Sequence, residues 1–507
     1  MKTKLLFILG YIFWYGQMFS QSYPIVDRIV HFDRFVQSLQ SRQVNATIRL
    51  DSIRSNNYDA ANSAYTLNSL QTFTFDSNNW NTEDSYNTWD ANNNTLMQQG
   101  KTEYTYTGSG AIAVMTYYYF DFNQNALVPS QKTSYTYNAS GQLIEVITQQ
   151  YDIPTSQFVN QQKEVYTYAQ TTDPKPNFVQ IYQWDTANSS WGDFQRANIT
   201  YNSNFQFTDI VMETKDNLNN TWVNSQHFTR SYDANFRLIE YIIQQWQGNT
   251  WINYSKKTVS YTPMGSYEEI IVENFSWDTT SSSWSINGKQ IKQVDTTDNI
   301  IQAEYFYWDS ASSQLVGSTK IVYTYNANDI EAAYFSWDSQ TQDWKTDNLQ
   351  KDIYTYDMSV TKNDLILPYN YGGNTSLTNS LFTTGIPSFD HLNHKLLNKE
   401  SFYRATVSDP WVPTYKQTYL YTDTAAGIDD SRQIAAKIYP NPFNDNIHFE
   451  VASDAYSINV YDLNGRLLFT ADLNSHASVN LSFLNKGVYI YKIQTDKGTA
   501  SGQIIKK

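Results

Sequence analysis

Residues 111–141 read AIAVMTYYYFDFNQNALVPSQKTSYTYNASG, and this stretch decides the fold. It holds two runs rich in β-branched and aromatic residues, separated by a polar loop at 121–125 and followed by a turn at 138–141. Runs of this composition predict β-strands, and two such runs around a short polar loop predict an antiparallel hairpin. The stretch is therefore expected to be one β-hairpin followed by a tight turn.

The same pattern recurs along the middle of the chain with a period of about 31 residues. Each unit ends in a strand with the pattern aromatic-x-aromatic, in which the aromatic residue is usually tyrosine and the first one is lost in some copies. The period is the distance between the second aromatic positions of successive units. That position holds Asp295 in one degenerate copy and an aromatic residue in the others: Phe75, Tyr106, Tyr137, Tyr168, Tyr201, Tyr232, Tyr261, Tyr325, Tyr356 and Tyr421. Self-similarity at a fixed period is typical of stacked repeats, and about eleven hairpins account for residues 65–425.

These features predict an all-β chain. Aromatic residues make up 16% of the sequence, and polar turn residues separate the strands. Stacked hairpins share edges and bury common faces, but strand twist keeps a sheet of about 22 strands from staying flat. We therefore expect an extended, coiled antiparallel β-hairpin repeat array that forms a spiral or curls on itself.

Two segments depart from the repeat. Residues 23–64 are expected to form an N-terminal cap with a short amphipathic helix, because apolar residues recur there at helical spacing: Ile25, Ile29, Phe32, Phe35, Val36 and Leu39. Residues 357–400 form an irregular insertion, and long insertions in repeat proteins often carry binding. The alternative for the insertion is a longer connection or a second cap.

The N-terminus carries the features of an exported protein. Lys2 and Lys4 precede an apolar run at 5–14, which is the layout of a secretory signal peptide over residues 1–22. The sequence has no cysteine, so we expect neither a lipidated cysteine anchor nor a disulfide. No later stretch reaches about 18 consecutive apolar residues, so no transmembrane segment is expected in the mature chain.

Residues 437–507 follow an expected linker at 426–436 and carry four sequence blocks in order. Turn signals and alternating polarity in this segment predict a small Ig-like β-sandwich of about seven short strands. The blocks are Tyr439-Pro440-Asn441-Pro442, then Gly465-Arg466, then Gly487 with Tyr489, and finally Lys506-Lys507.

In this order at a C-terminus, the four blocks resemble the type A sorting domain of the type IX secretion system of Gram-negative bacteria. The resemblance implies that the type IX secretion machinery is a partner and that the protein crosses the outer membrane. It also implies an extracellular or surface-attached location, with the sorting domain removed by a sortase-like peptidase. The alternative is an ordinary Ig-like module with no sorting role.

The aromatic repeat has a second resemblance. It is similar to the tyrosine-aspartate repeats of large bacterial surface and toxin-shell proteins, although its period is longer. This resemblance favours a β-hairpin shell over a compact globular domain.

The net charge and the motifs of the sequence limit the functions that we expect of the protein. The formal net charge is −14, so phosphate backbones are repelled and nucleic acid is not expected as a partner. His391 and His394 beside Asp390 form the one histidine cluster, and without a third ligand we expect no metal and no cofactor. The motifs of nucleophile elbows, zinc-protease helices and phosphate loops are missing from the sequence, so no catalytic residue is assigned.

Tryptophans flank successive hairpin loops in pairs. Opposed aromatic rings across two strands stabilise pairing, whereas a row of rings at hairpin mouths could stack on sugar or protein surfaces. Both roles are possible if each pair has one buried and one exposed ring. The candidate binding residues are Trp184, Trp191, Trp246, Trp251, Trp277, Trp284, Trp337 and Trp344.

The sequence thus favours a secreted or surface-bound, non-enzymatic module for binding or adhesion, with a glycan or a protein as ligand. A polysaccharide hydrolase that uses two carboxylates is an alternative, because no spacing rule excludes such a pair among 49 acidic residues. A purely structural surface component is a further alternative.

Deleting residues 437–507 should leave the signal peptide working, so that the truncated chain stops in the periplasm. Fractionation of cells that carry the full-length or the truncated chain measures this. Equal amounts of both at the cell surface would show that the tail has no sorting role.

Overall fold

The computed structural model describes residues 46–369, 393–424, 436–462, 466–495 and 498–507. The expected signal peptide, the expected helix at 25–39, and nearly all of the linker at 426–436 lie outside these residues. The chain divides into two compact units, the first reaching to Asp423 without 91–95, and the second formed mainly by Thr424–Lys507.

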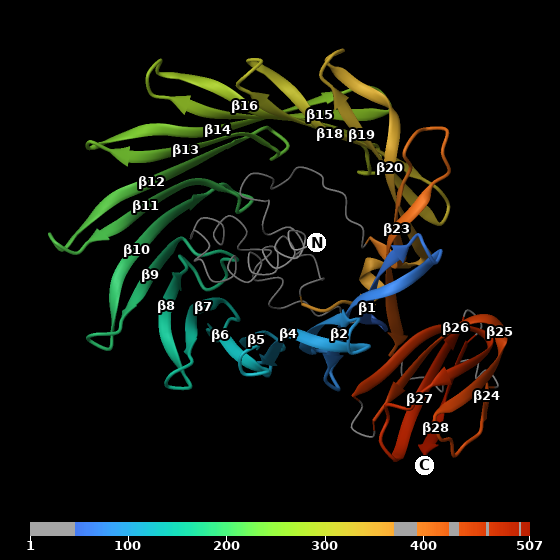
Figure 1. The fold of residues 1–507 in the computed structure, drawn as a ribbon. Coiled ribbons are helices and arrows are strands. Elements are labelled where there is room, and N and C mark those ends of the chain that lie inside the picture. The colour runs from blue at the N-terminus through green and yellow to red at the C-terminus, as the bar shows by residue number, and fades with distance from the viewer. Residues whose placement is uncertain (1–45, 370–392, 425–435, 463–465, 496–497) are drawn as a thin grey trace. The chain divides into compact units, whose positions relative to one another are not determined.

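The described residues contain 28 strands, and the first unit holds 23 of them in one sheet (Figure 1). The first twelve are β1 (Ile48–Asp59), β2 (Ala64–Phe75), β3 (Asn81–Asp90), β4 (Thr95–Tyr106), β5 (Ile112–Asp121), β6 (Ala126–Tyr137), β7 (Leu143–Asp152), β8 (Gln157–Thr167), β9 (Phe178–Asp185), β10 (Ser190–Tyr201), β11 (Phe207–Asp216) and β12 (Thr221–Tyr232). The rest are β13 (Leu238–Gln247), β14 (Thr250–Pro263), β15 (Tyr267–Asp278), β16 (Ser283–Asp295), β17 (Ile300–Asp309), β18 (Gln314–Tyr325), β19 (Asp329–Asp338), β20 (Asp343–Thr361), β21 (Leu365–Ile366), β22 (His394–Tyr403) and β23 (Val412–Asp423).

The large sheet closes on itself. From β4 to β20 each strand pairs antiparallel with the next one in the chain. β20 then pairs with β22, and β22 with β23. β1 pairs antiparallel with β2 on one side and with β23 on the other, from Ile48↔Asp423 to Asn57↔Tyr415. The described part of the chain is therefore an all-β structure in which, apart from the short β21, the strands pair antiparallel. Of the two expected forms, the sheet takes the one that curls on itself.

Two segments expected outside the hairpin array supply strands to it. Residues 48–59 belong to the expected cap, yet they form β1, which carries the closing contacts. In the expected insertion, Leu365–Ile366 form β21, which follows the short 3-10 helix Lys362–Asp364 and pairs parallel with β1. β22 (His394–Tyr403) begins in the last part of the insertion and continues beyond it. Most of the insertion's remaining residues, 370–392, lie outside the described residues.

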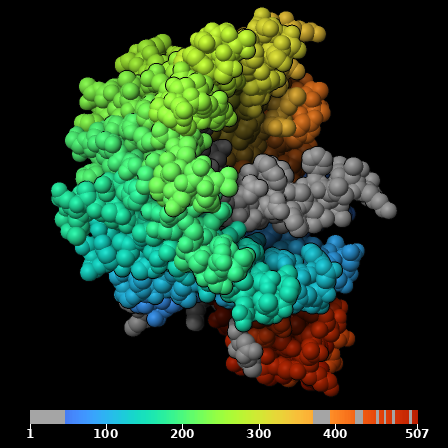
Figure 2. Space-filling model, turned by 90° about the vertical axis from the view of Figure 1, so that its left-hand side faces the viewer, coloured from blue at the N-terminus to red at the C-terminus, as the bar shows by residue number. Residues whose placement is uncertain are grey.

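Alternation along the strands gives the sheet two different faces. One face, here called the core face, carries three clusters of buried apolar residues, with Val179, Ile210 and Tyr241 in the largest. The other face, here called the opposite face, carries the tryptophan pairs and lysines that contact them, such as Lys163 and Lys256. In Figure 2, successive hairpins of the sheet lie next to one another as adjoining bands from teal to yellow.

A repeated tyrosine hydrogen bond joins the two strands of a hairpin on the core face. In each case the Oη of a tyrosine near the end of a hairpin donates to a main-chain carbonyl at or beside the start of that same hairpin, at 2.5–3.1 Å. We call this series the tyrosine ladder, and its pairs are Tyr106–Asn81, Tyr137–Ile112, Tyr168–Leu143, Tyr201–Pro176, Tyr232–Phe207, Tyr261–Leu238 and Tyr325–Ile300.

The second unit is a five-stranded sheet of β24 (Ala436–Tyr439), β25 (Asn446–Tyr461), β26 (Leu467–Asn480), β27 (Gly487–Thr495) and β28 (Gly498–Lys506). The order β24-β25-β27-β28 forms the main path, and β26 pairs with β25. Its own core includes Phe443, Ile458, Ile493 and Ile504. The second unit thus has five strands where the sequence predicted about seven short ones.

Replacing Tyr168 by phenylalanine removes the hydroxyl that the Leu143 carbonyl accepts. The free energy of unfolding of the first unit should fall by about 1 kcal/mol, which is typical of one hydrogen bond. Chemical denaturation of the purified chain measures this. Tyr254→Phe is the matched control, because Tyr254 is 55% exposed. Equal losses in the two variants would contradict a stabilising ladder.

Candidate binding site

The structure brings each predicted tryptophan pair together across its hairpin. The partners lie directly opposite each other, as in Trp191↔Trp184 and Trp246↔Trp251. Their ring centroids are 4.9–5.1 Å apart and their planes meet edge to face. All eight rings are half-buried on the opposite face, next to the polar hairpin loops. The pairs therefore fix the register of their hairpins.

The ring on the second strand of each pair is covered by a side chain from another hairpin. The covering groups are the Lys163 ammonium 5.3 Å from the Trp191 ring, the Lys256 ammonium 5.1 Å from Trp284, the His227 ring 5.3 Å from Trp251 and the Phe306 ring 5.5 Å from Trp344. These contacts join hairpin to hairpin by cation–π and ring packing. Trp191, Trp251, Trp284 and Trp344 are thus occupied in packing, and Trp337 also packs against Phe306. This favours the first-strand rings of Trp184, Trp246 and Trp277 as the ones open to a ligand.

A glycine lets one tryptophan pair approach its neighbouring strand. Gly317 lies in β18, and a Cβ at this position would overlap ring atoms of both Trp337 and Trp344. The pair also contacts Phe306 across the same surface, at 5.8 Å and 5.5 Å. Only a residue without a side chain fits beneath these rings.

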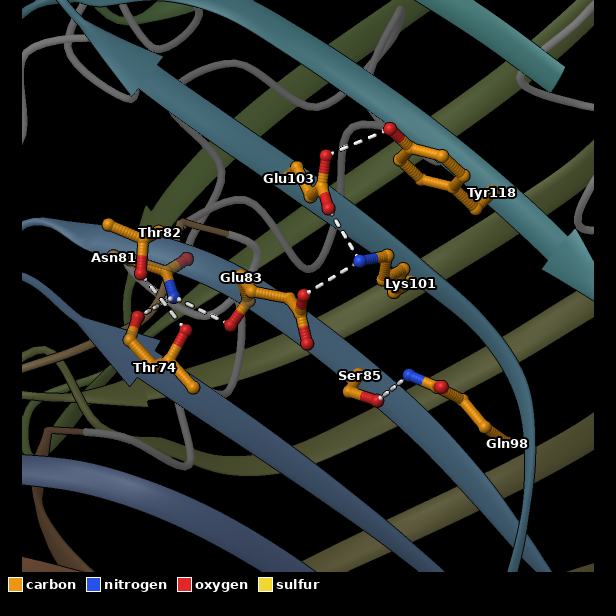
Figure 3. A network of polar contacts seen from close by, with 9 residues as sticks. All are labelled: Thr74, Asn81, Thr82, Glu83, Ser85, Gln98, Lys101, Glu103 and Tyr118. Carbon is orange, nitrogen blue, oxygen red and sulfur yellow. Dashed lines mark hydrogen bonds and ion pairs between the residues drawn. The ribbon is translucent and has the colours of Figure 1, made fainter. Parts of the chain in front are cut away.

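Cations on the opposite face form ion pairs with acids on the same strand or on a neighbouring strand. Figure 3 shows one such network, in which the Lys101 ammonium lies 3.1 Å from Glu83 and 2.5 Å from Glu103. Glu103 also accepts a hydrogen bond from the Tyr118 hydroxyl. Burial lowers the pKa of Lys101, but the hydrogen bonds to Glu103 and Glu83 outweigh it and leave that pKa above its ordinary value. Arg196, Lys320, Lys351 and Lys416 form equivalent ion pairs with acids.

The core face also carries buried cations. Burial, together with the charges of Arg230 and Lys292, lowers the pKa of Lys257 to about 7. Burial also lowers the pKa of Lys292 to about 8. These side chains come from β12, β14 and β16, so positive charge gathers on one part of the core face.

An open pocket of about 450 Å³ lies between β19, β20, β22 and β23, where no motif of the sequence predicts a site. Among its lining residues, the buried Asp352 carboxylate accepts hydrogen bonds from Ser401 Oγ at 2.6 Å and Tyr334 Oη at 3.0 Å. The Lys399 ammonium lies 3.0 Å from the same carboxylate. Burial, and then the nearby charge of Asp352, raises the pKa of Tyr334 well above its ordinary value.

The rim of this pocket adds an aromatic ring and an amide. Tyr403 is 44% exposed and lies opposite Gln350 in the strand pair. β-Bulges interrupt the pairing on both sides, after Tyr334 and after Ser401, and bulges re-aim side chains at strand ends. An exposed ring beside a carboxylate, a hydroxyl and an amide is chemistry that suits the hydroxyl groups and apolar face of a sugar.

The described residues do not assemble a metal centre. No group of three or more histidines and acids that could hold a metal ion occurs among them. His394 is the first residue of β22, whereas His391 and Asp390 lie outside the described residues. In the same part of the chain, no helix has the length and apolarity needed to cross a membrane.

In the second unit, the first and last of the four sequence blocks lie against each other. The Asn441 side chain donates from Nδ2 to the Gln503 carbonyl and accepts at Oδ1 from the Ile505 N–H, both at 2.9 Å. Phe443 and Lys507 add two main-chain bonds, Phe443 N–H to the Ile505 carbonyl and Lys507 N–H to the Phe443 carbonyl. Segment 441–443 is thus bonded to the chain end, with one parallel bridge between Phe443 and Lys506.

The structure also shows the contacts of the remaining residues of the four sequence blocks. Lys506 is 8% exposed, and its ammonium contacts the Asn444 carbonyl and lies 3.1 Å from Asp445. Tyr489 donates its hydroxyl to the Asn485 carbonyl, just before Gly487 at the start of β27. Arg466 pairs with Asp462 across the turn, and Gly465 lies outside the described residues. The bonds before Pro440 and Pro442 are both cis.

A family comparison agrees with this arrangement. Residues 437–507 match the secretion system C-terminal sorting domain. The C-terminal unit is therefore a sorting domain, as its sequence blocks predicted. A sorting domain of this kind indicates export across the outer membrane to the cell surface or the extracellular space.

Comparisons with other proteins add little. No curated protein matches the chain. A protein of unknown function from Bacteroides fragilis is 18% identical, with 27% of this chain and 96% of that one covered and a TM-score of 0.22. A porin-like protein from Bacteroides uniformis is 11% identical over 74% and 98%, with a TM-score of 0.20. The Photorhabdus luminescens Tc holotoxin pore is 9% identical over 90% and 24%, with a TM-score of 0.17. Scores this low establish no shared fold.

Gly317→Ala should lower the free energy of unfolding by about 1–3 kcal/mol, because the added methyl group displaces the Trp337 and Trp344 rings. Thermal or chemical denaturation of the purified chain checks this. Gly108→Ala is the matched control, since a Cβ there meets nothing within 4 Å. A Gly317→Ala variant as stable as the control would show that the rings do not pack on this strand.

Proposed function

We propose that this protein is an exported, non-enzymatic binding module that holds a glycan of the cell surface or its surroundings. The observation that carries the proposal is the pocket around Asp352. Ser401, Tyr334 and Lys399 hold the carboxylate in place, and each keeps further capacity to bond hydroxyl groups. The exposed Tyr403 ring supplies a flat apolar surface at the rim.

The tryptophan row offers a second contact surface for the same ligand class. The first-strand rings Trp184, Trp246 and Trp277 are half-buried and follow one another around the opposite face. The second-strand rings would then act as supports, because Lys163 and Lys256 already cover two of them. A protein ligand could use this row as well.

Two architectural details belong to the same proposal. The hairpins would be copies of one unit of about 31 residues, supported by the recurrence of the tyrosine ladder at Tyr106, Tyr137 and Tyr168. The sorting domain would be an Ig-like sandwich recognised by the type IX secretion machinery, supported by the match over residues 437–507.

Binding of the purified mature chain to a glycan array, followed by titration with the best glycan, tests the function. Tyr403→Ala and Asp352→Asn should each lower affinity at least about tenfold, since buried aromatic and charged contacts dominate binding. Tyr307→Ala is the matched control, because Tyr307 is also an exposed strand tyrosine, at 52%.

The other outcomes separate the alternatives. Affinity lost in Trp184→Leu and Trp277→Leu but kept in the pocket variants would move the site to the tryptophan row. Release of new reducing ends from a bound polysaccharide would make the protein a hydrolase and contradict the proposal. Failure to retain any glycan, while the chain is folded, would favour a structural surface component.

A further inference from the structure

The sorting domain presents one open face of its sheet beside the chain end. On β27 and β28, the side chains of Tyr489, Tyr491, Ile493 and Ile504 are buried in the domain core. The alternate side chains point the other way, and this second set is here called the terminal face: Val488, Ile490, Lys492, Gln503, Ile505 and Lys507.

The terminal face carries an apolar strip. Ile490 is 37% exposed and Ile505 is 40% exposed, although both lie in paired strands. Val488 lies directly opposite Ile505, and Ile490 lies opposite Gln503, so the three apolar side chains are neighbours. Apolar side chains grouped on an exposed sheet face mark interaction sites more often than scattered ones do.

The strip is held rigid from both sides. β28 pairs with β27 along Gly487↔Lys506 to Thr495↔Gly498, and Asn441 and Phe443 bond its other edge. Lys506, between the exposed Ile505 and Lys507, is buried against Asp445. A surface fixed in this way loses little conformational entropy when a partner binds.

The charge of this domain differs from that of the rest of the chain. Residues 437–507 hold 7 of the 35 lysines and arginines but only 6 of the 49 acids. Lys492 and Lys507 are exposed on the terminal face itself. A partner that fits would offer an apolar strip bordered by acidic groups, and such a partner would not be attracted to the acidic remainder of the chain.

We infer that the terminal face is the surface to which the export machinery binds. The partner is a component of that machinery with an apolar strip rimmed by carboxylates. The signal is then a folded surface, in which Lys506 and Asn441 position the strand and Ile490, Ile505, Lys492 and Lys507 make contact. The inference rests on the sorting role of residues 437–507.

The experiment follows export of the full-length chain in cells by fractionation. The double variant Ile490→Asp with Ile505→Asp should reduce the surface-exposed or released fraction at least tenfold and leave the protein in the periplasm. Lys492→Glu with Lys507→Glu should reduce it too, and because both lysines are exposed this change spares the fold. Phe483→Asp is the matched control, since Phe483 is 55% exposed on the same domain but outside the terminal face, and it should be exported normally.

A second measurement excludes simple unfolding. The periplasmic pool of each variant should resist limited proteolysis at the sorting domain as the wild-type chain does. Asn441→Ala, which removes two bonds to β28, should by contrast become protease-sensitive.

The deletion of residues 437–507 serves as a separate arm. If the deletion blocks export but both terminal-face variants are exported normally, the terminal face is not the recognition surface and only this inference fails. If the deleted chain is also exported, the sorting role itself fails. Loss of self-association in the aspartate variant, with normal export, would instead assign the face to a second copy of this chain and overturn the inference.

Discussion

The antiparallel pairing of β1 with β23 is the constraint on which the large sheet depends. A long open sheet has two edges with unpaired N–H and C=O groups, and such edges recruit other chains. Here the first and last strands supply partners for each other over Ile48↔Asp423 to Asn57↔Tyr415. Every hairpin between them must then twist and tilt so that the ends meet, which makes the contacts between neighbouring hairpins as important as those within each one.

The two faces of the sheet stabilise the hairpins and the contacts between them by different chemistry. On the core face, the tyrosine ladder joins the last strand of a hairpin to its start, as in Tyr168 with the Leu143 carbonyl. On the opposite face, tryptophan pairs lie beneath cations or rings from another hairpin, as in Trp191 with Lys163. Ion pairs such as Lys351 with Glu331 join strands within the same face. A chain without a single cysteine is thereby stabilised by many small, repeated contacts.

The features that could be predicted from the sequence are those that depend on residues close together in the chain. Aromatic and β-branched runs between polar turns predicted the hairpins, and the spacing of Trp184 and Trp191 around a loop predicted their pairing. The sorting domain was predicted from its four blocks. What escaped prediction depends on distant partners: β1 was assigned to a cap because nothing local shows that Ile48–Asp59 meets β23. The pocket was missed for the same reason, since Asp352 and Ser401 come from strands separated by the insertion, and two ordinary polar residues so far apart carry no signal.

A disulfide across the closing seam tests the closed sheet most directly. Ser55 lies opposite Gln417, and the two side chains meet at 3.4 Å, so Ser55→Cys with Gln417→Cys places two thiols side by side in a chain without other cysteines. Under mild oxidation the folded monomer of this variant should lose both free thiols and about 2 Da of mass, because one disulfide forms with the loss of two hydrogen atoms. The control variant Ser55→Cys with Thr258→Cys, whose cysteines lie on distant strands, should keep both free thiols. Free thiols in both folded variants would show that β1 and β23 do not pair, and the account of the fold would be wrong.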